Sequence, residues 1–251
     1  MTRRFGLLTI ALATALLAGC QDKTADDAAF GQRVRAYLLA HPEVLQESAR
    51  RLDARLVDDE IAAERQGAAR LPRLRAAVEH DGADFVAHPD GKITVTEFYD
   101  YRCPHCVNAA PRVVTLIRDH PQVRFVFKEM PIFGPLSEHA ARAALAVKAA
   151  GGDYVGLYGA LMATRGLDDA AIDTLARQKG VISIPPANAH LATTASLFTQ
   201  LGLGGTPAFI IGDTIVYGED MGAVEAAVAK AEAGVRTRVA AIEQQDAHKS
   251  R

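Results

Sequence analysis

The chain has 251 residues, enough for one ordinary domain and an additional segment. Hydrophobic residues make up 49% and aromatic residues 6%, with no Trp, so a soluble chain with a sizeable buried core is expected. The formal net charge of -2 gives no sign of the basic surface that nucleic-acid binding needs, so no nucleic-acid partner is expected.

Residues 1–19 have the features of a bacterial export signal. Arg3 and Arg4 form a basic start, and the apolar run behind them is too short for a comfortable membrane span. The run ends in Leu-Ala-Gly-Cys, which resembles a lipoprotein processing site where Cys20 is lipidated and becomes the first mature residue. The alternative is an ordinary secretory signal in which Cys20 has no role.

Cysteine usage favours lipidation of Cys20. Of the three cysteines, this assignment leaves Cys103 and Cys106 as a close pair and no stray exported thiol. Gln21 follows the lipid site, and by resemblance to bacterial lipoprotein sorting a residue other than Asp there favours the outer membrane. We therefore expect a periplasmic, lipid-anchored protein in a compartment where disulfides persist.

Residues 20–80 are expected to form a helical stalk, in which Pro42 begins a second helix. Gly67 and Pro72 should weaken this helix, so a third short segment is expected after them. The stalk carries an apolar stripe at mostly three-to-four spacing: Phe30, Val34, Tyr37, Leu38, Leu45, Leu52, Leu56 and Ile61. This stripe can pack on the catalytic domain or on further copies of the chain, which favours a homo-oligomer through residues 30–80. The alternative is an amphipathic spacer.

Two thiols lie where a predicted strand meets a predicted helix. β-branched and aromatic residues alternate over residues 93–99, and residues 107–119 have a helical pattern. Unpaired N–H groups and the dipole at a helix start favour a thiolate. We expect Cys103 to be the exposed nucleophile and Cys106, one turn later, the shielded resolving thiol.

The two residues between the cysteines suit this chemistry. Pro104 fits the first helical turn because it gives up no needed donor, and His105 could add a positive charge or a hydrogen bond beside the Cys103 sulfur. The alternative for Cys-x-x-Cys is half of a zinc site, which needs two further ligands at matched spacing. The sequence has no second pair and its eight His are scattered, so neither a metal nor a cofactor is expected.

Further elements surround the motif. Residues 85–88 and 92–99 are predicted to form a hairpin, and residues 123–129 a strand parallel to residues 93–99. Residues 135–200 have a helical pattern, with an Asp suited to capping near the start of two helices and Pro185-Pro186 beginning the last. Strands resume at residues 208–211 and 214–217, and residues 222–233 form a final helix.

Two motifs carry a family resemblance that covers residues 85–233. Glu97-Phe98-Tyr99-Asp100-Tyr101-Arg102-Cys103-Pro104-His105-Cys106 resembles the active-site run of the DsbA-like branch of the thioredoxin superfamily, and Gly205-Thr206-Pro207-Ala208-Phe209 resembles its second motif. The resemblance implies an α/β fold, thioredoxin-like, over residues 81–234, with an inserted helical domain at about 135–202 and a tail at 235–251. The run from Val34 to Leu45 resembles the N-terminal helical extension of the copper-sensitivity suppressor type.

The resemblance also implies roles for single residues. Pro207 should follow a cis peptide bond, and Thr206 should offer main-chain groups to an extended substrate segment, where Pro104 also lies. The alternative for Pro207 is a plain turn proline. DsbA has Val before this proline, whereas Thr206 is similar to the isomerase relatives, so the direction of the reaction stays open.

Glu97 lies six residues before Cys103, on the predicted strand. Pointing inward, it would have a raised pKa and could exchange a proton with Cys106. The alternative is a strand-end Glu that faces solvent. Lys128 could pair with it across the sheet.

These features predict an exported thiol–disulfide oxidoreductase that forms or isomerises disulfides through Cys103 and Cys106. Its expected partners are exported proteins with thiols or disulfides, a membrane redox partner, and the membrane through the lipid. The first alternative is a periplasmic Cu(I)-binding or relay protein that uses the same two thiolates. The second is a partner-anchoring module whose stalk is the main function.

Overall fold

The computed structural model describes residues 23–249, and its compact units divide between Asp59 and Glu60. The first unit contains α1 (Lys23–Ala40) and the start of α2 (Glu43–Glu79). The predicted second helix after His41 is confirmed, because α2 begins directly after Pro42. In this unit Phe30, Tyr37 and Leu45 are 61%, 57% and 55% exposed, so the predicted apolar stripe faces solvent in the single chain.

α2 continues past Gly67 and Pro72 to Glu79 as one helix, so the predicted third segment is wrong. The glycine serves close packing rather than a break. A side chain at Gly67 would collide with the carbonyl oxygen of Leu201. The residues of α2 from Glu60 onward therefore belong to the second unit, which begins well before the expected boundary at residue 80.

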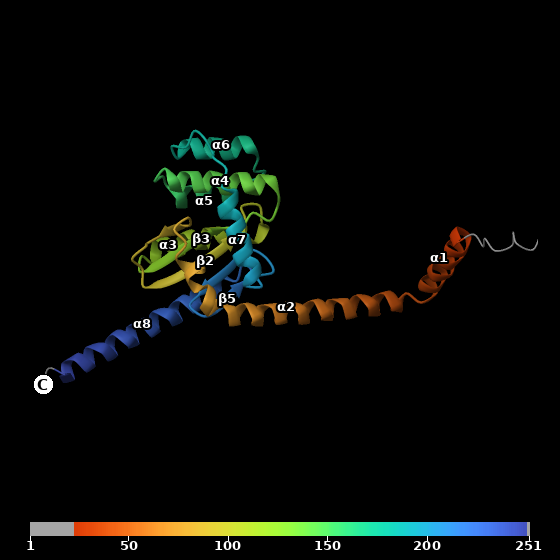
Figure 1. Cartoon of the computed structure of the whole chain (residues 1–251), viewed down its shortest axis with the longest axis horizontal. Coiled ribbons are helices and arrows are strands. Elements are labelled where there is room, and N and C mark those ends of the chain that lie inside the picture. The colour runs from red at the N-terminus through yellow and green to blue at the C-terminus, as the bar shows by residue number, and fades with distance from the viewer. Residues whose placement is uncertain (1–22, 250–251) are drawn as a thin grey trace, which may run out of the picture. The chain divides into compact units, whose positions relative to one another are not determined.

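The second unit is built on a five-stranded sheet of order β1-β3-β2-β4-β5 (Figure 1). β2 and β3 are parallel, as predicted, and β4 and β5 form the predicted antiparallel hairpin. β4 also pairs antiparallel with β2, which places β2 at the centre. The strands are β1 (Phe85–Ala87), β2 (Ile93–Tyr99), β3 (Val123–Glu129), β4 (Ala208–Ile211) and β5 (Thr214–Tyr217).

The predicted hairpin between β1 and β2 is wrong. β1 pairs antiparallel with β3, with Val86 opposite Val126. The connection from β1 to β2 crosses the start of β3, where the Lys92 N–H donates to the Gln122 carbonyl at 2.9 Å and Gly91 lies against the β3 backbone. β3 and β4 occupy the two edges of β2, and all three strands are buried along nearly their whole length. No edge of β2 is therefore left for β1.

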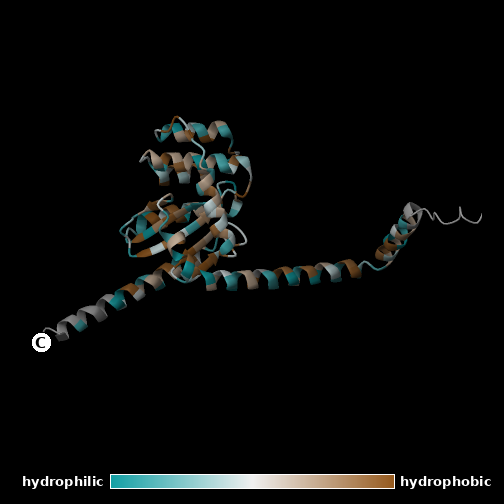
Figure 2. Ribbon diagram, in the orientation of Figure 1, coloured by the Kyte–Doolittle hydropathy of each residue, from teal (hydrophilic) through white to brown (hydrophobic). Residues whose placement is uncertain are grey.

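Helices cover both faces of the sheet, and Figure 2 shows the hydrophobic residues along the central strands. Val95 and Tyr99 of β2 pack in a large apolar cluster with α3 (Pro104–Asp119) and α8 (Met221–Lys249). Phe98, on the opposite face, packs with Leu71 and Val78 of α2. Alternate residues of β2 thus point to different cores.

A helical insertion separates β3 from β4, as predicted. Figure 1 shows α4 and α6 stacked on the side away from the sheet, and α7 leading back to it. Asp153 and Asp168 cap α5 and α6 by accepting hydrogen bonds from the N–H groups of Gly156 and Ala171, each at 2.8 Å. The insertion consists of α4 (Pro135–Ala149), α5 (Tyr154–Ala163), α6 (Asp169–Gln178) and α7 (Asn188–Gln200).

The final helix is longer than predicted. α8 begins at Met221 and runs on through the expected tail to Lys249. Within residues 23–249, no helix has both the length and the apolar character that crossing a membrane requires. Cys20 and residues 1–19 lie outside the described residues.

Candidate active site

Cys103 and Cys106 lie at the start of α3, at the carboxyl end of β2. Cys103 is the N-cap residue, with extended backbone angles, and Pro104 is the first residue of the helix. Cys103 is only 3% exposed and Cys106 is fully buried, so Cys103 is less accessible than expected. The Thr206 loop lies over it, because the Cys103 thiol donates to the Thr206 carbonyl oxygen at 3.1 Å.

The two thiols have opposite electrostatic environments. The pKa of Cys103 is lowered from 9.0 to about 5, chiefly because the Cys106 thiol donates a hydrogen bond to its sulfur. Burial opposes this shift, while the side chain of Thr206 and the N–H groups of Cys106 and His105 add to it. Burial raises the pKa of the Cys106 thiol well above its usual range. The lowered pKa of Cys103 agrees in direction with the predicted thiolate, but its largest cause is the Cys106 thiol rather than the helix start.

His105 acts on the Cys103 sulfur through its backbone. The N–H group of His105 contributes to the lowered pKa of Cys103. Its ring is largely exposed, and Nδ1 lies 3.4 Å from Oε1 of Glu219. The imidazole thus contacts Glu219, and only the backbone of His105 is among the causes of the lowered pKa of Cys103; the side-chain role expected for His105 stays a prediction.

The second motif completes the site as the resemblance implied. The peptide bond between Thr206 and Pro207 is cis. The Pro207 carbonyl accepts a hydrogen bond from the Gly218 N–H at 2.8 Å, which ties this loop to the end of β5. Thr206 presents its main-chain carbonyl beside Cys103, and Pro104 lies exposed next to it in the chain.

Glu97 points inward from β2 and is fully buried, so the alternative of a solvent-facing carboxylate is wrong. The Tyr158 hydroxyl of α5 donates to its two oxygens at 3.2 and 3.4 Å. Burial raises the pKa of Glu97 to about 8, and the charge of Glu129 adds to the increase. The charge of Glu97 in turn contributes to the raised pKa of Cys106, so the two groups are electrostatically coupled.

Lys128 does not pair with Glu97. It lies opposite Phe98 in the sheet register and therefore points to the other face. There its ammonium group contacts the Asp84 carboxylate at 2.5 Å and donates to the Ala77 carbonyl at 2.7 Å.

Glu129 is a buried acid that sequence reasoning missed. Its Oε1 accepts hydrogen bonds from Tyr99 and Tyr154 at 2.6 Å each and from Tyr101 at 3.1 Å. Burial is the main cause that raises its pKa to about 8. One signal was available, namely an acid at the end of an apolar strand.

Asp100 fixes the loop beside the cysteines. Its Oδ2 accepts hydrogen bonds from the N–H groups of Ile132 and Phe133 at 2.7 and 2.9 Å. Its own N–H donates to the Cys106 sulfur at 3.5 Å. Asp100 thus contacts Cys106 through its main chain and the segment that follows β3 through its side chain.

One group of residues has donors suited to a metal, away from the thiols. Within the described chain, ligand atoms of Asp81, Asp84 and His190 lie within 4.8 Å of one another. The Lys128 ammonium group already pairs with Asp84, and His190 Nε2 lies 3.3 Å from the same carboxylate, so Asp84 has partners within the protein.

Comparisons with known proteins agree with this geometry. A linker-deletion mutant of Proteus mirabilis ScsC is 26% identical, with a TM-score of 0.63 over 86% of this chain and 100% of that one. A thioredoxin-like oxidoreductase from Silicibacter pomeroyi is 34% identical, with a TM-score of 0.57 over 63% of this chain and 97% of that one.

A longer relative matches only in part. The Na(+)/H(+) antiporter NhaA 1 of Salinispora arenicola is 30% identical over 175 residues, which are 62% of this chain and 26% of the antiporter. The chain thus spans about a quarter of the length of this curated relative. Antiport is the activity of that longer protein.

Two family models match successive parts of the chain. The N-terminal domain of the copper resistance protein ScsC matches residues 26–56, and the DSBA-like thioredoxin domain matches residues 94–228. The second match covers more than half of the chain and includes both cysteines, Glu97 and the Thr206-Pro207 loop. The chain belongs to the DSBA-like thioredoxin domain family.

Proposed function

We propose that this chain is an exported, lipid-anchored enzyme that forms or isomerises disulfides in other exported proteins through Cys103 and Cys106. The observation that carries the proposal is the asymmetry of the two thiols. A nucleophile with a pKa of about 5 is a thiolate at neutral pH, whereas the buried Cys106 keeps its proton until it is needed.

In the reducing or isomerising direction, the Cys103 thiolate attacks a substrate disulfide. A mixed disulfide forms, and one substrate sulfur leaves with the electron pair of the old bond. Cys106 then gives its proton to ionised Glu97 and attacks the Cys103 sulfur. The second substrate thiolate leaves, and the protein keeps the Cys103–Cys106 disulfide, which completes reduction. In isomerisation a different substrate thiolate attacks the mixed disulfide instead, and Cys103 leaves as the thiolate, so the protein stays reduced.

In the oxidising direction the same bonds are exchanged in reverse. A substrate thiolate attacks the Cys103 sulfur of the protein disulfide, and Cys106 leaves as a thiolate that takes a proton from Glu97. A second substrate thiol then attacks the mixed disulfide and releases the Cys103 thiolate. The substrate is oxidised by two electrons and the protein is reduced by two.

Two features favour different directions. The low pKa of Cys103 stabilises the reduced protein, which makes its disulfide oxidising. Thr206 before Pro207, together with a stalk that could join several sites, favours isomerisation. An oligomer would hold several thiolates around one misfolded substrate.

The location and assembly complete the proposal. Residues 1–19 would be removed, Cys20 would carry the lipid in the periplasm, and residues 30–80 would associate with further copies through the apolar side chains that face solvent in the single chain. The redox domain would comprise residues 81–234 together with the docked end of α2.

Replacing Cys20 with Ser should move the protein from the membrane fraction to the soluble fraction, with the outer membrane expected for the wild type.

The decisive experiment combines a potential with two activity assays. The protein is equilibrated with glutathione buffers, and it is then tested on reduced and on scrambled ribonuclease. The Cys106→Ala variant should accumulate mixed disulfides with substrates, whereas the Cys103→Ala variant should form none. Absence of adducts with Cys106→Ala would overturn the proposal.

Cu(I) binding is the second candidate, because the two sulfurs are in hydrogen-bond contact and one of them is ionised. Titration of the reduced protein with Cu(I) separates the two functions. Tight binding without turnover of ribonuclease would favour the copper role.

A further inference from the structure

A groove begins at the active site and follows the outer face of α3. It has a volume of about 830 Å³ and lies between α3 and the end of α5. From Pro104 to Val114 the groove follows ten helical positions, about 15 Å, which is the length of four to five extended residues. Pro104 directly follows Cys103, so a chain linked to the Cys103 sulfur can reach the groove.

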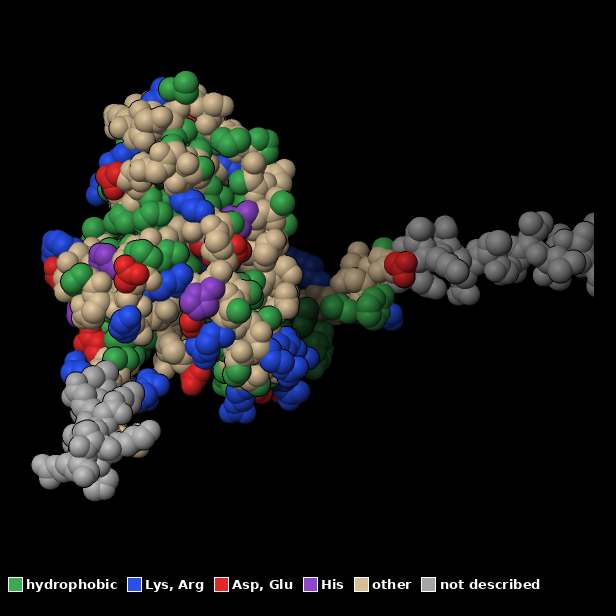
Figure 3. Space-filling model, turned by 60° about the vertical axis from the view of Figure 1, so that its left-hand side comes forward, with side chains coloured by type: hydrophobic (Ala, Val, Ile, Leu, Met, Phe, Trp, Pro, Cys, Tyr) green, Lys and Arg blue, Asp and Glu red, His purple; other side chains and the backbone are tan. Residues whose placement is uncertain are grey.

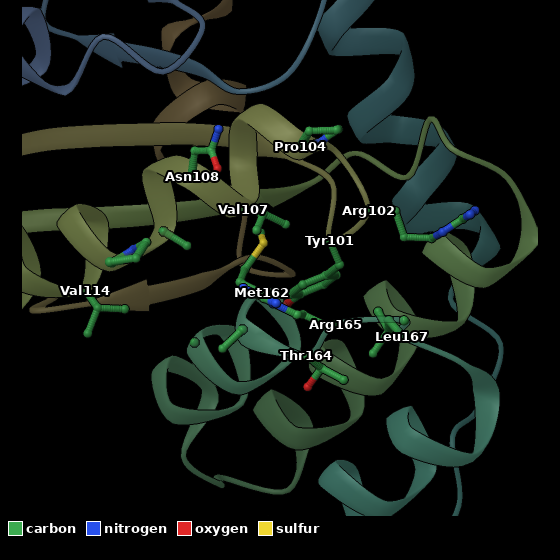
Figure 4. A pocket seen from close by; sticks show the side chains of 15 residues that line it. Tyr101, Arg102, Pro104, Val107, Asn108, Val114, Met162, Thr164, Arg165 and Leu167 are labelled. Atoms are coloured by element: carbon green, nitrogen blue, oxygen red, sulfur yellow. The ribbon is translucent and has the colours of Figure 1, made fainter.

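The walls of the groove are mostly apolar. Figure 4 shows Val107 of α3 close to Met162 of α5, with Leu167 on the side of Arg102, away from Val114. Figure 3 shows that hydrophobic side chains are also scattered among charged ones over the visible face of the second unit. Single exposed apolar residues are ordinary, so the shape of this groove and its charge distinguish it.

The charge of the groove has one sign. No Asp or Glu is present among its lining residues, which include Arg102 and Arg165. Arg102 points away from the groove in Figure 4 and donates to the Phe133 carbonyl at 2.6 Å. Arg165 has no hydrogen-bond or ion-pair partner among the residues that the structure describes. The neighbouring Asp168 is engaged in capping α6.

We propose that this groove binds the substrate segment next to the reacting cysteine and selects segments that combine apolar side chains with a carboxylate, which Arg165 pairs with. The proposal rests on the proposed function, because it places a substrate selectivity beside Cys103. A free guanidinium on an apolar wall suits an acidic group better than a basic one. Acidic, apolar substrates should therefore react faster than basic ones.

The test uses pairs of short peptides that differ in one residue, Glu or Lys, separated from a single cysteine by leucines. Separate series place this residue before and after the cysteine. Each cysteine is joined to the same 2-nitro-5-thiobenzoate group. The Cys103 thiolate attacks the peptide sulfur, and nitrothiobenzoate leaves with the electron pair of the broken S–S bond. Cys106 then loses its proton and attacks Cys103, and the peptide leaves as a thiol.

The expected ratio of second-order rate constants, Glu peptide over Lys peptide, is about two- to five-fold for the wild type at low salt in at least one series. Arg165→Gln should remove this preference, and Arg165→Glu should reverse it. High salt should shrink it, because the pair is near the surface. Arg177→Glu changes the net charge equally, outside the groove, and should leave the ratio unchanged.

A neutral substrate separates this proposal from the proposed function. Hydroxyethyl disulfide should react equally with the wild type and the Arg165 variants, since it is too small to fill the groove. Equal rates with the Glu and Lys peptides in both series, or a preference that survives Arg165→Glu, would overturn the groove proposal alone. No reaction of the wild type with hydroxyethyl disulfide would overturn the redox function itself.

Discussion

The hydroxyl of Tyr158 donates to both oxygens of Glu97, at 3.2 and 3.4 Å, in a fully buried site behind Cys106. Tyr158 belongs to α5 of the helical insertion, whereas Glu97 belongs to the central strand of the sheet. The insertion therefore directly contacts the acid that we propose exchanges a proton with Cys106. This contact makes the protonation of Glu97 depend on a residue far from the Cys-x-x-Cys motif in sequence.

Replacing Tyr158 with Phe should raise the pKa of Glu97 above about 8, because the lost hydrogen bond lowers it. In the proposed mechanism Cys106 loses its proton to ionised Glu97. The rate of the resolving step should therefore rise with pH through the pKa of Glu97. In the variant this rise should shift to higher pH. The measurement is the pH profile of single-turnover resolution. Tyr37→Phe, in the exposed stripe, is the control and should leave the profile unchanged.

Replacing Glu97 with Gln should stabilise the reduced protein at high pH. The folded pKa of about 8 lies above the ordinary value of 4.5, so the folded state binds the extra proton. Stability is therefore lost as pH rises from about 4.5 through about 8. The variant avoids this loss and should gain on the order of 1–4 kcal/mol at pH above about 8, with little gain near pH 4. Urea unfolding across pH measures this difference.

The rate of the resolving step should fall in Glu97→Gln, because Gln cannot accept the Cys106 proton. Exposed Glu47→Gln serves as the control for both measurements. If Glu97→Gln and the wild type had the same free energy of unfolding at every pH, the raised pKa of Glu97 would be contradicted.

The ionisation of Cys103 should depend on the donor at position 106. The Cys106 thiol is the largest cause of the lowered pKa of Cys103. Cys106→Ala removes that donor, so the pKa of Cys103 should rise above about 5. Cys106→Ser keeps an O–H donor and should leave it lower than in the Ala variant. Alkylation rates across a pH series give both values, and identical curves for Ala and Ser would contradict this assignment.

The redox motif and most of the sheet were predictable because their signals are local. Alternation over residues 93–99 and the Cys-x-x-Cys spacing depend on neighbours in sequence. The pairing of β1 with β3 was not predictable in this way, since the short loop at residues 89–91 suggests a hairpin. Only the burial of β2 between β3 and β4 excludes it.

The buried acids show the same division. Glu97 was predicted from its strand position and from the family resemblance. Glu129 was missed because its three tyrosine partners come from β2, the loop after it, and α5, which are brought together only by the fold. The predicted pairing of Lys128 with Glu97 was wrong. Strand register decides to which face of the sheet a side chain points, and the sequence alone left the register open.

Gly67 provides a prediction about the docked end of α2. Helix propensity alone favours Ala over Gly by about 1 kcal/mol in a helix interior. At Gly67, however, an added Cβ would collide with the Leu201 carbonyl oxygen, which is backbone and cannot turn aside. Gly67→Ala should therefore destabilise the second unit by about 1–3 kcal/mol, because the overpacked helix must move away.

Gly31 in α1 is the matched control, because nothing lies within 4 Å of a Cβ built there. Gly31→Ala should increase helicity and leave the unfolding midpoint of the second unit unchanged. Circular dichroism reports the helicity, and urea titration followed by tyrosine fluorescence reports the second unit. If Gly67→Ala matched Gly31→Ala in both measurements, residues 60–79 would not be packed against α7, and the redox domain would begin where the sequence first placed it.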